Sequence, residues 1–265
     1  MNRNLVIIGL FLGILTSCSG YEKLLKSSDY QLKYDKAFEY YAEEDYVRAA
    51  TLFEQIANVY RGTVKADTLQ YYRAMSYFKQ RDYIMASHYF DELYQSFRNS
   101  SFAEESAYMT GYCYFKLSPR PSLDQEYTLK AINTLTIFNI NYPNSERRKE
   151  AVEIITTLQD KIVEKSYLNA KLYFDLGYYK SAIIALRNSL NEFPNTTYRE
   201  QLLFMILRAN YLLADNSIES KKKERFQATV DEYYSYIGEY PEGKFSGEAK
   251  LMYESSMLFL GEKLN

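Results

Sequence analysis

The chain has few of the residues from which catalytic and metal sites are usually built. Its 265 residues include one histidine, two cysteines and no tryptophan. A catalytic triad or a zinc centre would therefore have almost no imidazole or thiol groups to use. The strings GxGxxG, HExxH, GxSxG and GxxxxGK followed by Ser or Thr are also missing, which removes the common signals for nucleotide, metal and hydrolase sites. We expect a protein that is not an enzyme and holds no metal or cofactor.

An excess of one charge and a long apolar run are missing as well. The 32 basic and 34 acidic residues give a formal net charge of −2, which argues against nucleic acid as a partner because such proteins normally carry a basic excess. The apolar run Leu5–Leu15 has 11 residues, whereas a membrane-spanning helix needs about 20. Nothing after this run has the pattern of a membrane-spanning segment.

The first residues have the layout of an export signal. Arg3 precedes the apolar run, and small residues then lead to a cysteine in Leu15-Thr16-Ser17-Cys18. This end resembles the bacterial lipobox, in which the cysteine thiol receives diacylglycerol and the preceding signal is removed. The resemblance implies a signal peptide over 1–17 and a mature chain anchored to a membrane through lipid on Cys18. The alternative for the run is a transmembrane helix or a buried apolar helix.

The anchor has consequences for the rest of the chain. Two or three acyl chains hold a protein stably on a membrane, and residues 18–28 would be a lipidated tether. Ser19 and Gly20 show no acidic sorting pair, which favours the outer membrane. Because the other cysteine carries the lipid, Cys113 has no intrachain disulfide partner, and its apolar neighbours indicate a buried thiol. His88, on an expected helix, is interpreted as a surface or packing residue.

Tyrosine is abundant, and the aromatic residues follow a repeat. The chain contains 29 tyrosines and 15 phenylalanines. The apolar and aromatic positions from Ala37 to Tyr60 match those from Ala74 to Phe97 at an offset of 37 residues. The same spacing returns before Tyr142-Pro143, before Phe193-Pro194 and, more weakly, before Tyr240-Pro241. Apolar residues recur at the spacing of a helix face, and the small alanines allow close helix contact, so each unit is interpreted as two helices.

The repeat resembles the tetratricopeptide repeat, a helix-turn-helix unit of about 34 residues. The resemblance implies an all-α, right-handed superhelical solenoid of about five helical hairpins, with a C-terminal capping helix over Phe245–Lys263. The sequence departs from the pattern where Glu44 and Arg81 occupy the position of the usual turn glycine. We place the N-terminal repeats, units 1–3, at 29–144, and the C-terminal repeats, units 4–5 with the cap, at 145–265.

Two segments break the period: Leu117–Thr128 is expected as an insertion between the helices of the third unit, and Asp215–Glu224 is expected to loosen the fifth unit. Ser145–Asp175 is expected as one extended or bent helix. Prolines end the second helices, and Ser145 or Thr196 is expected to cap the helix that follows. The turns inside the first two hairpins are expected at Asp45 and Asp82.

A solenoid of this type presents a concave surface lined by first-helix residues that do not pack against the neighbouring helix. With Ala37, Ala74 and Gly111 as the close-contact positions, the expected groove is mostly aromatic, with a lysine at equivalent places in two units. Its residues are Tyr34, Phe38, Tyr41, Tyr71, Met75, Phe78, Lys79, Tyr108, Tyr112, Phe115 and Lys116. Such a surface suits a protein partner, and lysine can pair with a peptide carboxylate. The alternative is that the rings pack between helices, or that the register is displaced by one position.

The lipobox, the repeats and several strings together resemble one family, the D lipoprotein of the outer-membrane β-barrel assembly machine (BamD). The resemblance covers about residues 18–262, and the insertion in the third unit is shorter than in some members. The strings are YYAEEDY at 40–46, YPNS at 142–145, KSYLNAKLYF at 165–174 and FPNT at 193–196.

The resemblance implies a lipid-anchored scaffold at the outer membrane, facing the periplasm. Its partners would be a BamA-like insertase, other subunits of the assembly machine and unfolded outer-membrane β-barrel substrates. The N-terminal repeats would bind the aromatic-ended signal of the substrate, for which the aromatic groove with Lys79 and Lys116 is suited. The C-terminal repeats would contact the insertase, and Arg187 is our candidate for that contact. The alternative is a tetratricopeptide lipoprotein that acts on envelope or peptidoglycan partners or in glycan uptake.

Overall fold

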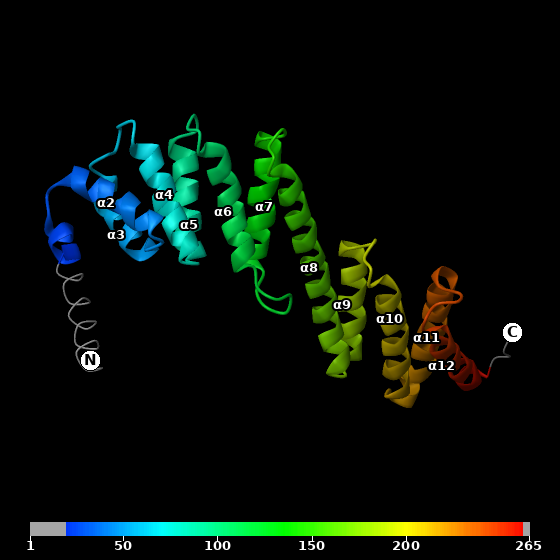
Figure 1. Ribbon diagram of the computed structural model, residues 1–265. Helices are drawn as coiled ribbons and strands as arrows, with labels where there is room; N and C mark the ends of the chain where they lie inside the picture. The colour runs from blue at the N-terminus through cyan, green and yellow to red at the C-terminus, as the bar shows by residue number, and fades with distance from the viewer. Residues whose placement is uncertain (1–19, 262–265) are drawn as a thin grey trace, which may run out of the picture. The chain divides into compact units, whose positions relative to one another are not determined.

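The computed structural model describes residues 20–261, and Cys18, the expected lipidation site, lies outside this part. The described residues form helices and connecting turns without a strand, which confirms the all-α prediction (Figure 1). The helices are α2 (Tyr30–Ala42), α3 (Tyr46–Ala57), α4 (Ala66–Lys79), α5 (Tyr83–Ser96), α6 (Ala103–Leu117), α7 (Glu126–Asn141), α8 (Arg148–Asp175), α9 (Tyr179–Glu192), α10 (Arg199–Asp215), α11 (Glu219–Glu239) and α12 (Ser246–Leu260).

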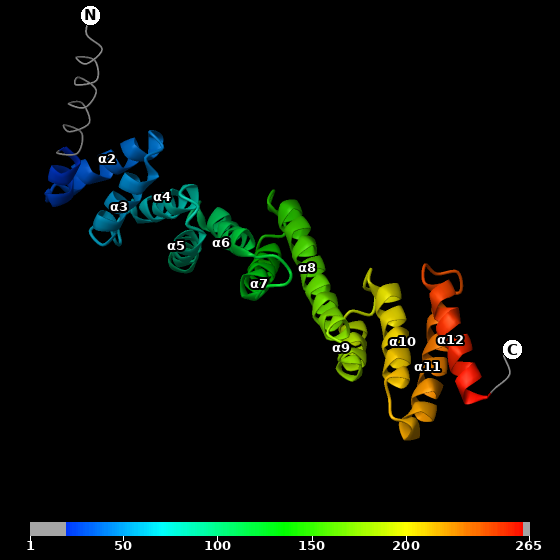
Figure 2. The same ribbon diagram turned by 90° about the horizontal axis from the view of Figure 1, so that it is seen from below.

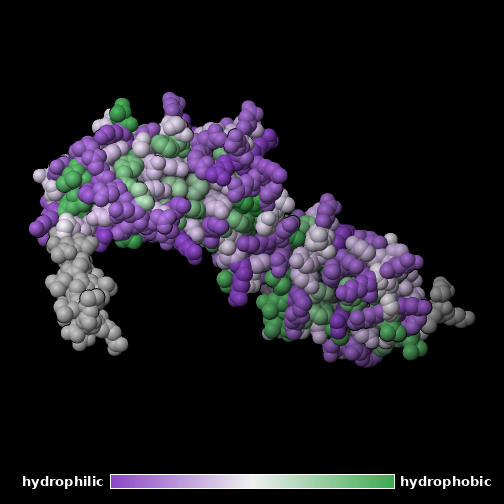
Figure 3. Space-filling model, in the orientation of Figure 1, coloured by the Kyte–Doolittle hydropathy of each residue, from purple (hydrophilic) through white to green (hydrophobic). Residues whose placement is uncertain are grey.

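The chain forms two compact units. Unit 1 comprises the described parts of Met1–Pro119 and Gln125–Leu158, and unit 2 comprises those of Arg120–Asp124 and Gln159–Asn265. The division falls inside α8, so this helix belongs to both units. The boundary predicted between residues 144 and 145 lies just before the helix and stays a prediction. Hydrophilic residues cover most of the face of each unit seen in Figure 3, with smaller hydrophobic patches between them.

Unit 1 contains three helical hairpins whose helices form two rows. α2, α4 and α6 lie in one row and α3, α5 and α7 in the other, and each helix packs on the next in chain order (Figure 2). Ala37, Ala74 and Gly111 are buried, as predicted for the close-contact positions, because a small residue lets two helix backbones approach. Each second helix adds a buried phenylalanine to the core: Phe53, Phe90 and Phe138.

The turn inside a hairpin follows one design. Asp45 and Asp82 precede α3 and α5, and each carboxylate accepts a hydrogen bond from the backbone N–H three residues later, which caps the helix. The residues before these aspartates, Glu44 and Arg81, have left-handed backbones with φ of 62° and 63°. Gly177 has φ of 77° at the corresponding turn before α9. The turn therefore requires a conformation that glycine adopts at less cost than glutamate or arginine.

Residues 20–26, inside the expected tether, are helical and pack on the first hairpin. Leu24 is buried in the core that α2 and α3 share. The Tyr21 ring meets the Tyr40 ring edge to face, with 5.7 Å between centroids, and the Arg48 guanidinium lies 5.1 Å from the Tyr21 ring. The chain is therefore held against unit 1 within a few residues of Cys18.

Unit 2 contains the C-terminal part of α8 and the four helices that follow. α8 runs unbroken for 28 residues, which confirms the single long helix predicted over Ser145–Asp175. Ala170 of α8 packs with Ala182 and Leu186 of α9 and with Leu202 of α10. α12 packs on α10 and α11 and ends the stack, as predicted for a capping helix.

The turns that follow the prolines differ from the prediction. The hydroxyls of Ser145 and Thr196 do not cap a helix. They accept hydrogen bonds from the backbone N–H two residues later, those of Arg147 at 3.1 Å and Tyr198 at 3.2 Å, and both donors precede the helix. Hydrogen bonds of this kind stabilise the turn and not the helix, because the hydroxyl bonds to the backbone N–H nearest to it in the chain.

The expected insertion in the third hairpin is the segment between α6 and α7.

Candidate functional site

The residues predicted to line a groove lie on α2, α4 and α6, the first helices of the hairpins in unit 1. Most are half-buried rings in mutual contact. Tyr72 lies at the centre, with its ring centroid 4.9 Å from those of Phe38 and Tyr41 and 5.6 Å from that of Tyr71. Sequence reasoning did not include Tyr72. We call the partly exposed members the aromatic band: Tyr34, Phe38, Tyr41, Tyr71, Tyr72, Met75, Phe78, Tyr112 and Phe115.

The band continues onto α6 through Tyr112, whose ring centroid is 6.0 Å from that of Phe78. Tyr108, also predicted to line the groove, stacks on Tyr112 with 5.7 Å between centroids but is only 1% exposed. Phe138 packs on one side of it, and the Arg147 guanidinium lies 5.0 Å from its ring. Tyr108 therefore supports the band from inside the protein and offers no surface to a partner.

Three lysine side chains lie at or near the aromatic band. Lys79 and Lys116 are exposed at positions 37 residues apart in the repeat. The Lys116 ammonium lies 4.8 Å from the Tyr112 ring centroid, a cation–π distance. Sequence reasoning missed a third cation, Lys65, whose ammonium lies 4.3 Å from the Tyr34 ring centroid. Lys65 precedes α4 in a loop, and the repeat alignment compares helical positions only, so it gave no signal there.

Two tyrosines of the band, Tyr41 and Tyr71, keep their protons at physiological pH. Burial raises the pKa of Tyr41 and of Tyr71 to about 12. The rings therefore offer apolar faces and uncharged hydroxyls, and the lysines supply the charge. This combination can hold a segment that carries aromatic side chains together with a carboxylate.

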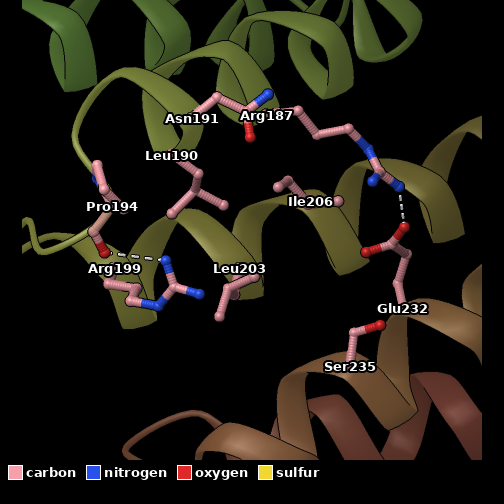
Figure 4. Close-up of a pocket in the computed structure, with 9 residues that line it drawn as sticks. All are labelled: Arg187, Leu190, Asn191, Pro194, Arg199, Leu203, Ile206, Glu232 and Ser235. Carbon is pink, nitrogen blue, oxygen red and sulfur yellow. Dashed lines mark hydrogen bonds and ion pairs between the residues drawn. The ribbon is translucent and has the colours of Figure 1, made fainter.

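Arg187, the predicted insertase contact, lies on α9 at a pocket of about 480 Å³ in unit 2 (Figure 4). Its side chain is 55% exposed and donates a hydrogen bond to the carboxylate of Glu232 on α11. Burial raises the pKa of Glu232, although the charge of Arg187 acts in the opposite direction. Arg187 is therefore paired with Glu232 through Nη2, while about half of its side chain stays exposed.

A second arginine, Arg199, lines the other side of this pocket (Figure 4). It donates two hydrogen bonds of 2.7 Å to Glu239 and one of 3.0 Å to the carbonyl oxygen of Pro194. The hydrogen bonds from Arg199 lower the pKa of Glu239. The wall between the two arginines is apolar and consists of Leu190, Leu203 and Ile206.

Cys113 and His88 are the cysteine and the histidine within the described residues. Cys113 is buried, and burial raises the pKa of its thiol to about 12. His88 is exposed on α5, with its ring beside that of Tyr89. Among residues 20–261, no group of three or more His, Cys, Asp or Glu side chains could hold a metal ion. Over the same residues, every helix is too short or too polar to cross a membrane.

Comparison with known proteins gives a curated relative and a solved structure of low similarity. A curated protein of Aquifex aeolicus (strain VF5), named "Putative outer membrane protein assembly factor BamD", is 26% identical over 145 residues, which is 55% of this chain and 45% of that protein. The match thus spans less than half of the relative. A solved structure, described as "TPR2AB-domain:pHSP90-complex of yeast Sti1", aligns over 86% of this chain and 98% of its own with 14% identity, but its TM-score of 0.38 is too low to support an argument.

A family match covers more of the chain. The model of the YfiO family, described as "Outer membrane lipoprotein", matches residues 27–226. These residues include all of unit 1 that follows the helix at 20–26 and most of unit 2, with the aromatic band and the part of the Arg187 pocket on α9 and α10. The chain therefore belongs to the YfiO family of outer membrane lipoproteins.

Proposed function

We propose that this protein is a lipid-anchored scaffold on the periplasmic side of the outer membrane and takes part in the assembly of outer membrane proteins. Its family and the name of its Aquifex relative support this role. The lipobox-like end at Cys18 would supply the anchor. The helix at residues 20–26 packs on unit 1 and would keep that unit close to the membrane.

The aromatic band is the observation that carries the substrate-binding part of the proposal. Half-exposed rings follow one another over three consecutive hairpins, and an exposed lysine recurs at the same repeat position in two of them. The strands of membrane β-barrel proteins alternate apolar with polar residues and carry aromatic residues near their ends, at the membrane interfaces. The band would bind the aromatic residues of such a segment, and Lys79 and Lys116 would pair with its terminal carboxylate.

Peptide binding tests this part. The probe is a peptide that ends in phenylalanine with a free carboxylate, and its amide-ended form is the matched ligand. We expect the double variant Lys79→Gln, Lys116→Gln to bind the free-acid peptide about tenfold more weakly, since each exposed pair contributes up to about 1 kcal/mol. The variant Lys221→Gln, Lys250→Gln removes two exposed lysines of unit 2 and is the control. Equal affinities for the acid and amide peptides would refute the role of the lysines.

The second part of the proposal concerns the central insertase. The pocket at Arg187 has an exposed guanidinium beside apolar residues, a combination that suits a protein contact. Purification of the membrane-solubilised complex tests it: the insertase should co-purify with the wild-type chain and be lost from Arg187→Glu. Arg208→Glu, at an arginine that is 45% exposed and pairs weakly with Glu248, is the control. A complex that lacks the insertase and contains a peptidoglycan or glycan-uptake partner would replace this function with another.

A further inference from the structure

A second, smaller pocket lies in unit 1 on the side of α4 opposite the aromatic band. It has a volume of about 110 Å³ and is walled by the end of α3, by α4 and by α5. At about 100° per residue, Arg73 lies about 160° around the helix axis from Met75 of the band, and Gln70 lies about 140° from it. A ligand in this pocket would therefore leave the band free.

Two buried side chains in the pocket have donor groups without a partner. Gln70 is 7% exposed and Arg73 is 8% exposed. The Gln70 amide nitrogen Nε2 and the Arg73 Nε are both buried and make no hydrogen bond with any residue in 20–261. Buried donors in folded proteins are almost always paired, because leaving one unpaired is costly. A ligand that accepts hydrogen bonds would remove this cost.

The surroundings of Arg73 fix the direction of its free N–H. The guanidinium lies 3.7 Å from the centroid of the Tyr89 ring, and its Nη2 donates to Glu92 at 3.1 Å. The hydroxyls of Tyr89 and Tyr77 donate in turn to one oxygen of Glu54, at 2.9 and 2.7 Å. The donor is therefore held in place before any ligand arrives, which lowers the entropic cost of binding.

The next repeat shows that hairpin packing does not require these donors. An equivalent pocket of about 130 Å³ lies between α5 and α7 over α6. Residues 37 positions after Gln70 and Arg73 are Ala107 and Thr110, and both line it. Thr110 satisfies its own hydroxyl by donating to the Ser106 carbonyl oxygen at 2.9 Å. Among the described residues, two buried hydroxyls of α6, those of Ser106 and Tyr108, are also without a hydrogen-bond partner, but neither residue lines this second pocket, and none of its lining residues has an unpaired buried donor. A pair of unpaired donors facing a pocket is therefore particular to the first pocket.

We propose that the pocket at Gln70 and Arg73 binds a carboxylate of a partner protein. The two oxygens of a carboxylate accept from two neighbouring donors, which matches the amide Nε2 and the guanidinium Nε. Arg61 and Glu92 also line the pocket, so its two guanidinium groups and one carboxylate give a net charge of +1, which fits a monoanion. A phosphate, with its higher charge, would lie against Glu92 and is disfavoured. The site would be a contact independent of the aromatic band.

NMR titration of the full mature chain in detergent micelles tests the proposal. The probes are a capped peptide with one internal glutamate, a peptide whose only carboxylate is its C-terminus, the matched glutamine peptide with both ends capped, and inorganic phosphate. We expect one of the two carboxylate peptides to shift the side-chain signals of Gln70 and Arg73, and which of them does so identifies the source of the carboxylate. Binding of phosphate alone, or equal shifts with the glutamine peptide, would overturn the proposal.

Variants localise the effect. Gln70→Glu replaces the amide donor by a carboxylate, which repels the carboxylate of the ligand, and should weaken its binding at least tenfold. Gln95→Glu makes the same change in the equivalent pocket and should leave the affinity unchanged. Arg61→Gln changes an exposed rim residue without touching the core and should weaken binding about threefold, so the test does not depend on the stability of a buried variant. Unchanged affinity in both Gln70→Glu and Arg61→Gln would also overturn the proposal.

Discussion

Gly111 of α6 lies directly against Leu135 of α7: a Cβ built on the glycine would be 2.7 Å from both Cγ and Cδ2 of the leucine. Leu135 is fully buried and cannot move aside without disturbing the core. We expect Gly111→Ala to lower the free energy of unfolding by about 1–3 kcal/mol despite the better helix propensity of alanine. Chemical denaturation measures this. Gly238→Ala, in a helix with open space around the new Cβ, should be neutral or stabilising, and equal losses in both variants would contradict the packing argument.

The positive φ values at Glu44 and Arg81 predict two stabilising substitutions. A non-glycine residue in this conformation costs about 1–2 kcal/mol. Glycine avoids this cost, but it loses more conformational entropy on folding, which offsets part of the gain. We expect Glu44→Gly and Arg81→Gly each to raise the free energy of unfolding by about 0.5–1 kcal/mol. Gly177→Ala reverses the change at the corresponding turn and should lower the stability. Thermal and denaturant unfolding of the three variants would show whether the signs agree.

The pair Arg199 and Glu239 predicts a pH dependence of stability. The pKa of Glu239 is lowered in the folded protein by its hydrogen bonds to Arg199, so its contribution is present above the unfolded pKa of about 4.3 and is lost as the pH falls through the folded pKa. We expect Glu239→Gln to cost about 0.5–1 kcal/mol near pH 7 and almost nothing at the acid end. Glu242→Gln, at an exposed residue, is the control and should show no such trend.

Cys113 predicts slow thiol labelling. With its pKa raised to about 12, about one thiol in ten thousand is ionised at pH 8, and burial also blocks access. In a Cys18→Ser variant, we expect an aromatic disulfide reagent to label Cys113 at least a thousandfold faster in denaturant than in the folded protein. The labelling rate then reports unfolding. Fast labelling without denaturant would mean that the core around α6 opens readily.

The fold could be read from the sequence because its repeat is regular. Small residues at Ala37, Ala74 and Gly111 and the aspartates at the turns each have a local cause that recurs at the same spacing, and the family resemblance that they supported is confirmed by the match over residues 27–226. The long α8 was predictable because no proline or turn signal interrupts it. The hydroxyls of Ser145 and Thr196 were assigned to the wrong role because the competing turn geometry is not visible in the residue types alone.

The binding surface was less predictable, since neighbouring elements decide exposure. Tyr34, Tyr71 and Tyr108 occupy the same repeat position, yet only Tyr108 is fully buried. Arg147, just before α8, lies over the ring of Tyr108. The spacing of the repeat does not predict which unit is followed by an arginine in this place. The unpaired donors of Gln70 and Arg73 were equally hidden, because a donor is unpaired only by the absence of neighbours that lie far away in the sequence.

The helix shared by the two units has a consequence for local opening of the chain. α8 gives Leu158 to one core and Ala170 to another, and the residues between them include none that is buried. Contacts with unit 2 begin again at Lys165, which donates to the Leu123 carbonyl oxygen, and at Ser166 and Tyr167, which contact Ser189 and Tyr198. Residues 159–164 have neither a buried side chain nor one of these contacts, and such stretches open at low free energy. Backbone amides in this middle section should exchange with deuterium before those at either end, so the helix would soften from its centre while both ends stay folded.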